Sequence, residues 1–276
     1  PKTLSNFPQA IPDSPGIPKK VSEEVIVAPF NDTDMFKSIL NEHHEQLGAV
    51  IVEPFQRLIP PAPGFLEVLR DMTLKYDIPL IFDEIVTGFR FSYGGAQEFY
   101  SVTPDLCSLG KIIGGGFPLA AVGGRKDLMQ LFDKDAVGDK HFLPQIGTLS
   151  GNPVASAAGL ATLEILKSKS AYETVFDTGR VLMGELEAAM KDYGHSAVIL
   201  GEPPLFDVFF TDNEISNYRG ILKADAGKGS AFNKLLRSHQ VFKGDSKFYV
   251  SLAHNEDDVN LTVNAIREAA RALNDI

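Results

Sequence analysis

The sequence contains one cysteine, no tryptophan and no long apolar run among its 276 residues. The single thiol, Cys107, excludes an internal disulfide and a metal site built from several cysteines, and it fits a reducing compartment. No stretch approaches the roughly 20 apolar residues of a membrane helix, and no basic segment precedes an apolar leader. We therefore expect a cytoplasmic protein with no membrane partner and no metal.

Basic residues are also in deficit. The 26 Lys and Arg residues against 36 Asp and Glu residues give a net charge of −10, and such a surface repels the phosphates of nucleic acids and anionic membranes. With 44% hydrophobic and 22% charged residues, the composition excludes disordered, collagen-like and coiled-coil chains. The length allows one large domain or two ordinary ones, each with a buried core.

Short apolar runs alternate with amphipathic segments in the first half of the chain. We expect strands at 49–52, 78–82 and 119–122, and helices at 31–46, 65–76, 152–167 and 173–193. Alternating strands and helices predict an α/β fold with a parallel sheet covered on both faces. The chain opens with a proline-rich loop to about Pro29. We expect residues 1–170 to form part of a large domain, and residues 171–276 to form a connecting helix and a small C-terminal α+β domain. The small domain should contain strands at 205–210 and 248–252 and helices at 231–238 and 256–273.

Two acids, Glu53 and Asp83, directly follow apolar runs. Ligands of parallel sheets bind beyond the carboxyl ends of the strands, so both carboxylates are candidates for a site. Asp83 should be partly desolvated and in need of a cationic partner. The alternative for Asp83 is a helix N-cap or a turn.

One lysine lies between apolar pairs, in the segment Leu109-Gly110-Lys111-Ile112-Ile113, with glycines at 110 and 114–116. We expect its ammonium group to lie against apolar surface, which favours a nucleophilic amine, and the glycines to admit a bound group. The alternative is a lysine that extends to solvent beside a flexible turn.

A buried aspartate and a buried lysine together suggest pyridoxal phosphate, because the lysine forms a Schiff base with the aldehyde and the aspartate keeps the pyridine nitrogen protonated. The segment 147–153 offers hydroxyl and backbone N–H groups for a phosphate, or else an ordinary capping turn.

Five segments in this order and spacing carry a resemblance to a known family. They are Ile-Phe-Asp-Glu-Ile-Val-Thr-Gly-Phe-Arg at 81–90, Gly-Gly-Ala-Gln at 94–97, Thr-Pro-Asp-Leu at 103–106, Leu-Gly-Lys-Ile-Ile-Gly-Gly-Gly at 109–116, and Gly-Thr-Leu-Ser-Gly-Asn-Pro at 147–153. Nearly the whole chain resembles class III aminotransferases, and it is most similar to their glutamate-1-semialdehyde aminomutase branch. The resemblance implies a pyridoxal-phosphate-dependent transferase of fold type I, a homodimer with shared active sites.

The resemblance also implies roles by position. Lys111 resembles the Schiff-base lysine, and Asp83 resembles the partner of the pyridine nitrogen. Ile85 resembles the aliphatic residue packed on one ring face, and Gln56 matches a position near the cofactor's hydroxyl. Thr148 resembles the threonine that reaches the phosphate of the neighbouring subunit.

The segment after Glu53-Pro54 is shorter than in aminomutases and includes Arg57. An arginine there could bind a substrate carboxylate through two hydrogen bonds, or it could be a solvated surface residue.

The family's amino-terminal part, roughly 150 residues for a domain of usual size, has no counterpart in this chain. By resemblance, that part carries the main phosphate-binding turn and the aromatic that stacks on the cofactor. We therefore expect a fragment that binds the cofactor weakly and exposes a sheet face and edge.

Ser108-x-x-Lys111 also matches penicillin-recognising hydrolases, but the Lys-Thr-Gly element that they require is absent. The expected activity is transamination between an amine or amino acid and a keto acid or aldehyde, by a ping-pong mechanism. Two alternatives stay open: an aminomutase-type isomerase, and a catalytically silent fragment that acts only as a dimerisation unit.

Overall fold

The computed structural model describes residues 10–275. Its first sheet contains β1 (Val50–Val52), β2 (Leu80–Glu84), β3 (Leu106–Leu109) and β4 (Ala121–Gly124), in that spatial order. The strands β1, β2 and β3 are parallel, and β4 is antiparallel to β3. The expected α/β fold with a mostly parallel sheet is confirmed.

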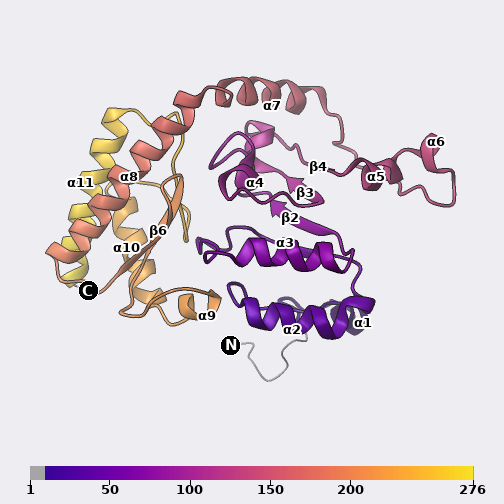
Figure 1. Ribbon diagram of the computed structural model, residues 1–276. Coiled ribbons are helices and arrows are strands. Elements are labelled where there is room, and N and C mark those ends of the chain that lie inside the picture. Colours follow the sequence, from indigo (N-terminus) through magenta and orange to yellow (C-terminus); the bar gives the residue numbers. More distant parts are fainter. Residues whose placement is uncertain (1–9, 276) are drawn as a thin grey trace.

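One face of this sheet is covered by α2 (Thr33–His43) and α3 (Phe65–Lys75) (Figure 1). Asp32 begins α2 by accepting a hydrogen bond from the Met35 backbone N–H. Alternation along β2 buries Leu80 and Phe82 on the side of α3, where they share a core with Leu69. The side of the sheet that packs against the helices is therefore apolar.

The opposite face is open. Cross-strand register aligns Ile51 with Ile81, and Asp83 with Ser108 and Val122, so these residues share that face. Ile51 is 67% exposed and Val122 is 52% exposed. The outer edge of β1 has no partner strand within residues 10–275. The expected exposed face is thus present, and along the edge of β1 residues 24–26 line a cavity beside the strand.

The second sheet is antiparallel and consists of β5 (Val198–Glu202), β6 (Leu205–Phe209) and β7 (Phe248–Tyr249). It packs on α8 (Lys169–Asp192), α10 (Ala226–Ser238) and α11 (Glu256–Ala272), around a core that includes Phe206 and Phe232. An ion pair of 2.6 Å between Arg267 and Glu185 joins α11 to α8. Leu200 and Leu205 belong to the core of the first sheet, so the two parts pack against each other. A domain boundary between 170 and 171 stays a prediction.

The two parts are joined by α7 (Pro153–Leu166), which runs along one side of the molecule in Figure 1. The short helices α5 (Lys126–Met129) and α6 (Lys134–Val137) stand away from both sheets (Figure 1). The remaining short elements are α1 (Lys19–Glu23), α4 (Gly95–Phe99), α9 (Tyr218–Ile221) and the 3-10 turns η2 (His44–Gln46), η3 (Lys111–Gly114), η4 (Gln130–Phe132) and η5 (Leu273–Asp275). A loop was expected from residue 1 to about Pro29, and α1 interrupts it. Residues 1–9 of that loop lie outside the described part of the chain. No helix between residues 10 and 275 combines the length and apolar content needed to cross a membrane.

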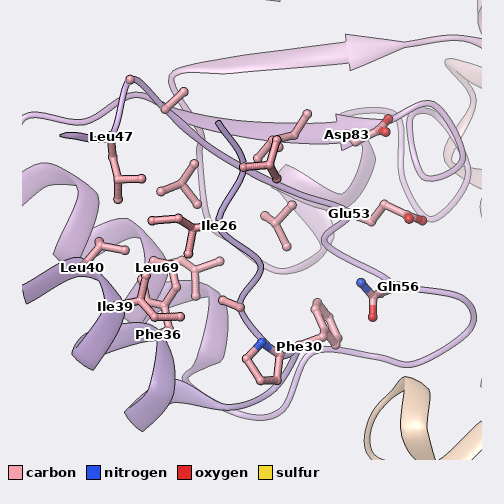
Figure 2. A pocket seen from close by; sticks show the side chains of 18 of the residues that line it. Ile26, Phe30, Phe36, Ile39, Leu40, Leu47, Glu53, Gln56, Leu69 and Asp83 are labelled. Carbon is pink, nitrogen blue, oxygen red and sulfur yellow. The ribbon is translucent and has the colours of Figure 1, made fainter. Parts of the chain in front are cut away.

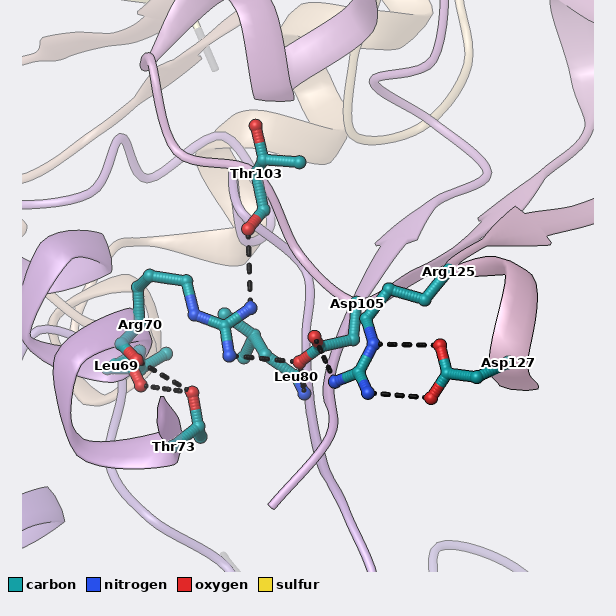
Figure 3. A network of polar contacts seen from close by, with 8 residues as sticks. All are labelled: Leu69, Arg70, Thr73, Leu80, Thr103, Asp105, Arg125 and Asp127. Atoms are coloured by element: carbon teal, nitrogen blue, oxygen red, sulfur yellow. Dashed lines mark hydrogen bonds and ion pairs between the residues drawn. The ribbon is translucent and has the colours of Figure 1, made fainter. Parts of the chain in front are cut away.

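An ion-pair network ties the amino ends of β2 and β3 together (Figure 3). Asp105 accepts hydrogen bonds from the Leu80 N–H at 2.8 Å, Arg70 at 2.9 Å and Arg125 at 3.0 Å. Arg125 also forms a two-bond pair with Asp127. Burial acts to raise the pKa of Asp105, but the Leu80 N–H and the two guanidinium groups outweigh it, so the pKa is lowered.

Candidate active site

The predicted site residues come from the opposite, carboxyl edge of the same sheet. Glu53 follows β1, Asp83 lies near the end of β2, and Lys111 follows β3. Because β1, β2 and β3 are parallel, their carboxyl ends meet at one edge. The three charged groups therefore gather where ligands of parallel sheets bind.

Asp83 is half-buried and is held in place by neutral donors. Its Oδ1 accepts hydrogen bonds from Ser108 Oγ at 2.9 Å and from the Ile85 backbone N–H at 3.1 Å. No cation pairs with it among the described residues, contrary to the expectation of a cationic partner. The bond to Ile85 is that of a turn, but no helix begins here, and Oδ2 stays open to a further donor.

The buried carboxylate of Glu84 organises the loop that follows Asp83. Glu84 is 0% exposed and accepts hydrogen bonds from Thr87 Oγ1, the Ala96 N–H and Gln97 Nε2, at 3.1, 2.6 and 2.8 Å. These bonds join the end of β2 to the start of α4 and so fix the intervening residues 85–95. Glu84 is a positioning residue that the sequence pattern did not single out.

Lys111 opens the turn η3 in a left-handed backbone conformation, with φ of +50°. The turn packs closely on α7, because a β-carbon at Gly115 would lie 2.7 Å from the Ala158 carbonyl oxygen. Ile85 packs over Gly110 and is 37% exposed. Lys111 itself is exposed, so the expected desolvation of its ammonium group is wrong for the described residues. The reason is its place beyond the last residue of β3, at the uncovered edge of the sheet.

A cavity of about 660 Å³ runs along β1 and ends at the polar edge (Figure 2). Its apolar wall comes from α2, α3 and the preceding segment, including Ile26, Leu40 and Leu69. Glu53, Gln56, and Asp83 line its polar end. The structure thus brings Gln56 into the same cavity wall as Asp83.

Arg57 and Thr148 are both exposed. The Arg57 guanidinium lies 4.6 Å from the ring centroid of Tyr218, a cation–π contact with α9. Thr148 lies in the long connection between α6 and α7. No hydrogen bond or cavity of the described residues joins Thr148 to Asp83 or Lys111.

Charges from both parts of the molecule meet at Glu53. Burial raises the pKa of Glu53, and the nearby Asp83 carboxylate raises it further, against opposing effects of Lys247, Arg57 and Lys111. Lys247, which precedes β7, responds in the opposite direction: burial lowers its pKa, while Glu53 opposes that change. The two groups come from different sheets, and no direct ion pair forms between them within residues 10–275.

The sequence analysis did not identify three residues that lie at this edge: Arg90, Lys247 and Tyr249. Arg90 is only 9% exposed, and burial lowers its pKa. The only available signal was an arginine between two phenylalanines inside the 81–90 motif. Nothing in the sequence indicated that Lys247 and Tyr249, about 160 residues further on, would face it. Residues 10–275 contain no group of three or more His, Cys, Asp or Glu side chains that could hold a metal ion.

Comparison with known proteins gives consistent matches. Residues 2–234 match the family described as Aminotransferase class-III. The glutamate-1-semialdehyde 2,1-aminomutase of Pelotomaculum thermopropionicum is 41% identical over 268 residues, which cover 95% of this chain and 61% of that protein. An omega-transaminase from Sphaerobacter thermophilus superimposes with a TM-score of 0.91 and 32% identity, covering 97% of this chain and 62% of that one. A structure described as a transaminase with PLP bound gives a TM-score of 0.85 and 26% identity, over 94% and 60% of the two chains. The chain therefore spans about three fifths of the relatives that it matches.

Proposed function

Because the chain belongs to the class III aminotransferase family, we propose that it is the carboxy-terminal part of a pyridoxal-phosphate-dependent transaminase. The enzyme would move an amino group between an amine or amino acid and a keto acid or aldehyde. One observation carries the proposal most directly: Asp83 and Lys111 come from adjacent parallel strands and reach the same sheet edge, next to a cavity.

The residues present fit pyridoxal phosphate. Asp83 has one carboxylate oxygen fixed by Ser108 and Ile85, which leaves Oδ2 for the pyridine nitrogen. Ile85 offers an exposed apolar side chain beside Gly110, suited to one face of a ring. Gln56 lies in the shared cavity wall, suited to the hydroxyl group. When bound, the cofactor supplies an electron sink for a carbanion.

The remaining steps belong to side chains of this chain. Asp83 would hold a proton at the ring nitrogen and so keep a positive charge there. The Lys111 amine would hold the cofactor by condensing with its carbonyl group, with loss of water, and as a free amine it would serve as the base and then the acid that moves a proton between two carbons of the substrate–cofactor system. The open face and exposed position of Lys111 leave room for that movement. Arg57, which is exposed and lies over the Tyr218 ring, is a candidate for binding a substrate carboxylate.

We further propose a homodimer. Several apolar residues are exposed on the segment between β4 and α7 (residues 125–152) and on its neighbours, where a second subunit would cover them. They are Leu143, Ile146 and Leu149 on the segment, and Phe117 and Leu160 beside it. Thr148 lies on this segment, as expected of a threonine that reaches the phosphate of the other subunit. The lone thiol of Cys107 is the ground for proposing a cytoplasmic location.

A second candidate is an isomerase that moves an amino group within one molecule, because a relative at 41% identity is named an aminomutase. Both candidates use Asp83 and Lys111 in the same way. Product analysis separates them: a transaminase yields a carbonyl compound from the donor, whereas an aminomutase releases only an isomer.

Labelling tests the assignment of Lys111. Borohydride reduction of the full-length protein loaded with pyridoxal phosphate should leave a pyridoxyl group on Lys111, read by peptide mass spectrometry. Lys247 is the internal control, because it is the other lysine that faces the site and burial lowers its pKa. A label on Lys247 or elsewhere, with Lys111 unlabelled, would sink the assignment.

Titration of residues 1–276 alone tests the fragment. Charge-assisted hydrogen bonds contribute about 1.5–3 kcal/mol each, so a chain without the main phosphate-binding turn should bind pyridoxal phosphate orders of magnitude more weakly than the full-length protein. The visible absorption of the bound cofactor and amine transfer are the readouts. Tight stoichiometric binding with turnover by the isolated chain would refute the fragment interpretation.

A further inference from the structure

Arg90 is a buried cation without an anionic partner. Its side chain lies among the residues that follow β2, and only 9% of the residue is exposed. Its Nε donates to the Val86 carbonyl oxygen at 2.7 Å, and its guanidinium lies 4.9 Å from the ring centroid of Tyr249. No carboxylate within residues 10–275 forms an ion pair with it. Buried charges in proteins are paired as a rule, so this guanidinium is suited to an external anion.

The Nη atoms of Arg90 are accessible. They make no hydrogen bond to the described residues. Among those residues, the buried side-chain nitrogens and oxygens without a partner are Arg70 Nε and Tyr100 Oη. The Arg90 Nη atoms are therefore not sealed inside protein. With Nε already bonded to the main chain, the two Nη groups present the edge of the guanidinium that can bind two oxygens of one anion.

Lys247 is a second cation at the same place. It is half-buried and has no ion-pair partner within 4.0 Å among the described residues. It lies two residues before Tyr249, whose ring the Arg90 guanidinium contacts at 4.9 Å, so Lys247 and Tyr249 lie on the same side of this strand. Burial lowers the pKa of Lys247 most, and the Arg90 charge lowers it a little further. Two cations placed close together repel each other, and an anion bound by both removes that repulsion.

The position of Lys247 is fixed by a buried ion pair beneath it. Lys243 Nζ lies 2.9 Å from Asp207 Oδ2, with side chains 4% and 7% exposed. Lys243 also donates to the Gly244 carbonyl oxygen at 3.1 Å, and Gly244 pairs with Lys247 in an isolated β-bridge. The hairpin that presents Lys247 is thus anchored to β6, and Lys247 is a built feature of the second sheet rather than a free surface lysine.

We propose that Arg90 and Lys247 together bind the carboxylate of an amino-acid or keto-acid substrate. This assignment rests on the proposed function, and it replaces Arg57 as the principal carboxylate-binding residue. Arg57 is exposed and already stacks on Tyr218, whereas Arg90 is preorganised by Val86 and Tyr249. Each carboxylate group of a substrate carries one charge, whereas a phosphate group carries about two. The Glu53 carboxylate, whose charge already acts on Lys247, repels the more highly charged group more strongly, so a carboxylate suits the site better.

Calorimetric titration of residues 1–276 without cofactor tests the site directly. The probes are succinate, its uncharged analogue succinamide, and inorganic phosphate. Succinate should bind, and succinamide should not. Both Arg90→Gln and Lys247→Gln should weaken succinate binding at least about tenfold, since each removes a charge-assisted contact. Lys126→Gln, an exposed lysine on α5, is the matched control and should bind succinate as the unmodified chain does.

The other outcomes contradict the proposal. If Arg57→Gln weakens succinate binding while Arg90→Gln and Lys247→Gln do not, then Arg57 is the residue that binds the carboxylate. Succinamide binding equal to succinate binding, or tighter binding of phosphate through the same two residues, refutes a carboxylate site. A thermal scan checks each variant, and if Arg90→Gln unfolds, Lys247→Gln alone decides. Succinate binding is measured without cofactor, so a failure to transaminate would refute the proposed function and leave this assignment standing.

Discussion

At the amino ends of β2 and β3 the buried carboxylate has cationic partners, whereas at the carboxyl edge of the same sheet two buried or half-buried charges have none among the described residues. Asp105 is satisfied by a backbone N–H and two arginines, and its pKa is lowered. At the other edge, Glu53 and Arg90 are both shifted toward their neutral forms by burial, and neither has an ion-pair partner within residues 10–275. The ion pairs of Asp105 join neighbouring strands, whereas the charged groups of Glu53 and Arg90 are available to bind a ligand.

The largest expected effect is a loss of stability on disrupting the ion pairs at the amino ends of β2 and β3. Asp105→Asn leaves Arg70, whose side chain is 15% exposed, without its anion. Removing one partner of a buried pair costs about 3–5 kcal/mol, so the free energy of unfolding should fall by that amount in urea titration. A loss below about 1 kcal/mol would mean that this network does not hold the strands.

Acid provides a second readout of the same group. Because the pKa of folded Asp105 is lowered, its contribution to stability is present above the ordinary carboxyl pKa of about 4 and is lost as the pH falls through the lowered value. The difference in stability between Asp105→Asn and the unmodified chain should therefore shrink on acidification. Asp127→Asn is the control: this carboxylate is exposed, and its removal should change stability far less.

The next effect is catalytic and lies at the carboxyl end. Asp83→Ala in the full-length protein removes the group that would keep the cofactor protonated, and the turnover number should fall roughly 10²-fold or more. Stability should change little, because the ion pairs at the amino end are untouched. Ser108→Ala keeps the carboxylate but removes one of its two hydrogen bonds, so its loss of rate should be smaller. Near-normal turnover of Asp83→Ala would make the carboxylate a turn residue only.

The smallest expected effect has the opposite sign. Burial and Asp83 disfavour the charged form of Glu53, so Glu53→Gln should slightly raise the melting temperature at neutral pH. A raised pKa means a contribution to stability that is present in acid and lost as the pH rises through the folded-state value. The gain in Glu53→Gln should therefore appear as the pH rises and vanish in acid. A lower melting temperature in Glu53→Gln at neutral pH would show that Lys247 stabilises the carboxylate more than burial disfavours it.

The sequence predicts the elements that follow strong periodic patterns, including β1, β2, α3, α7 and α11. It does not reveal β3 and β5: Leu-Cys-Ser-Leu, between Pro104 and Gly110, is short and lacks β-branched residues, and β5 depends on pairing with β6. The antiparallel direction of β4 also comes from tertiary pairing.

The residues of the candidate site also fall into those that local sequence patterns predict and those that depend on tertiary packing. Glu53, Asp83 and Lys111 are predictable because each follows a strand of one parallel sheet, and strand ends of a parallel sheet converge. Arg90 and Lys247 are not, because they meet only when the second sheet packs on the first. The exposure of Lys111 could not be predicted either, since it depends on which surfaces the described residues leave uncovered.

The packing of α7 has a mechanical consequence. A side chain at Gly159 would run into the carbonyl oxygen of Ile113, so the helix and the turn that carries Lys111 are in contact backbone to backbone, with no compressible side chain between them. Only Lys167 and Ser168 separate α7 from α8, the long helix beneath the second sheet. Because these contacts are made by backbone atoms, any displacement of α7 or of α8 would also displace the turn that carries Lys111.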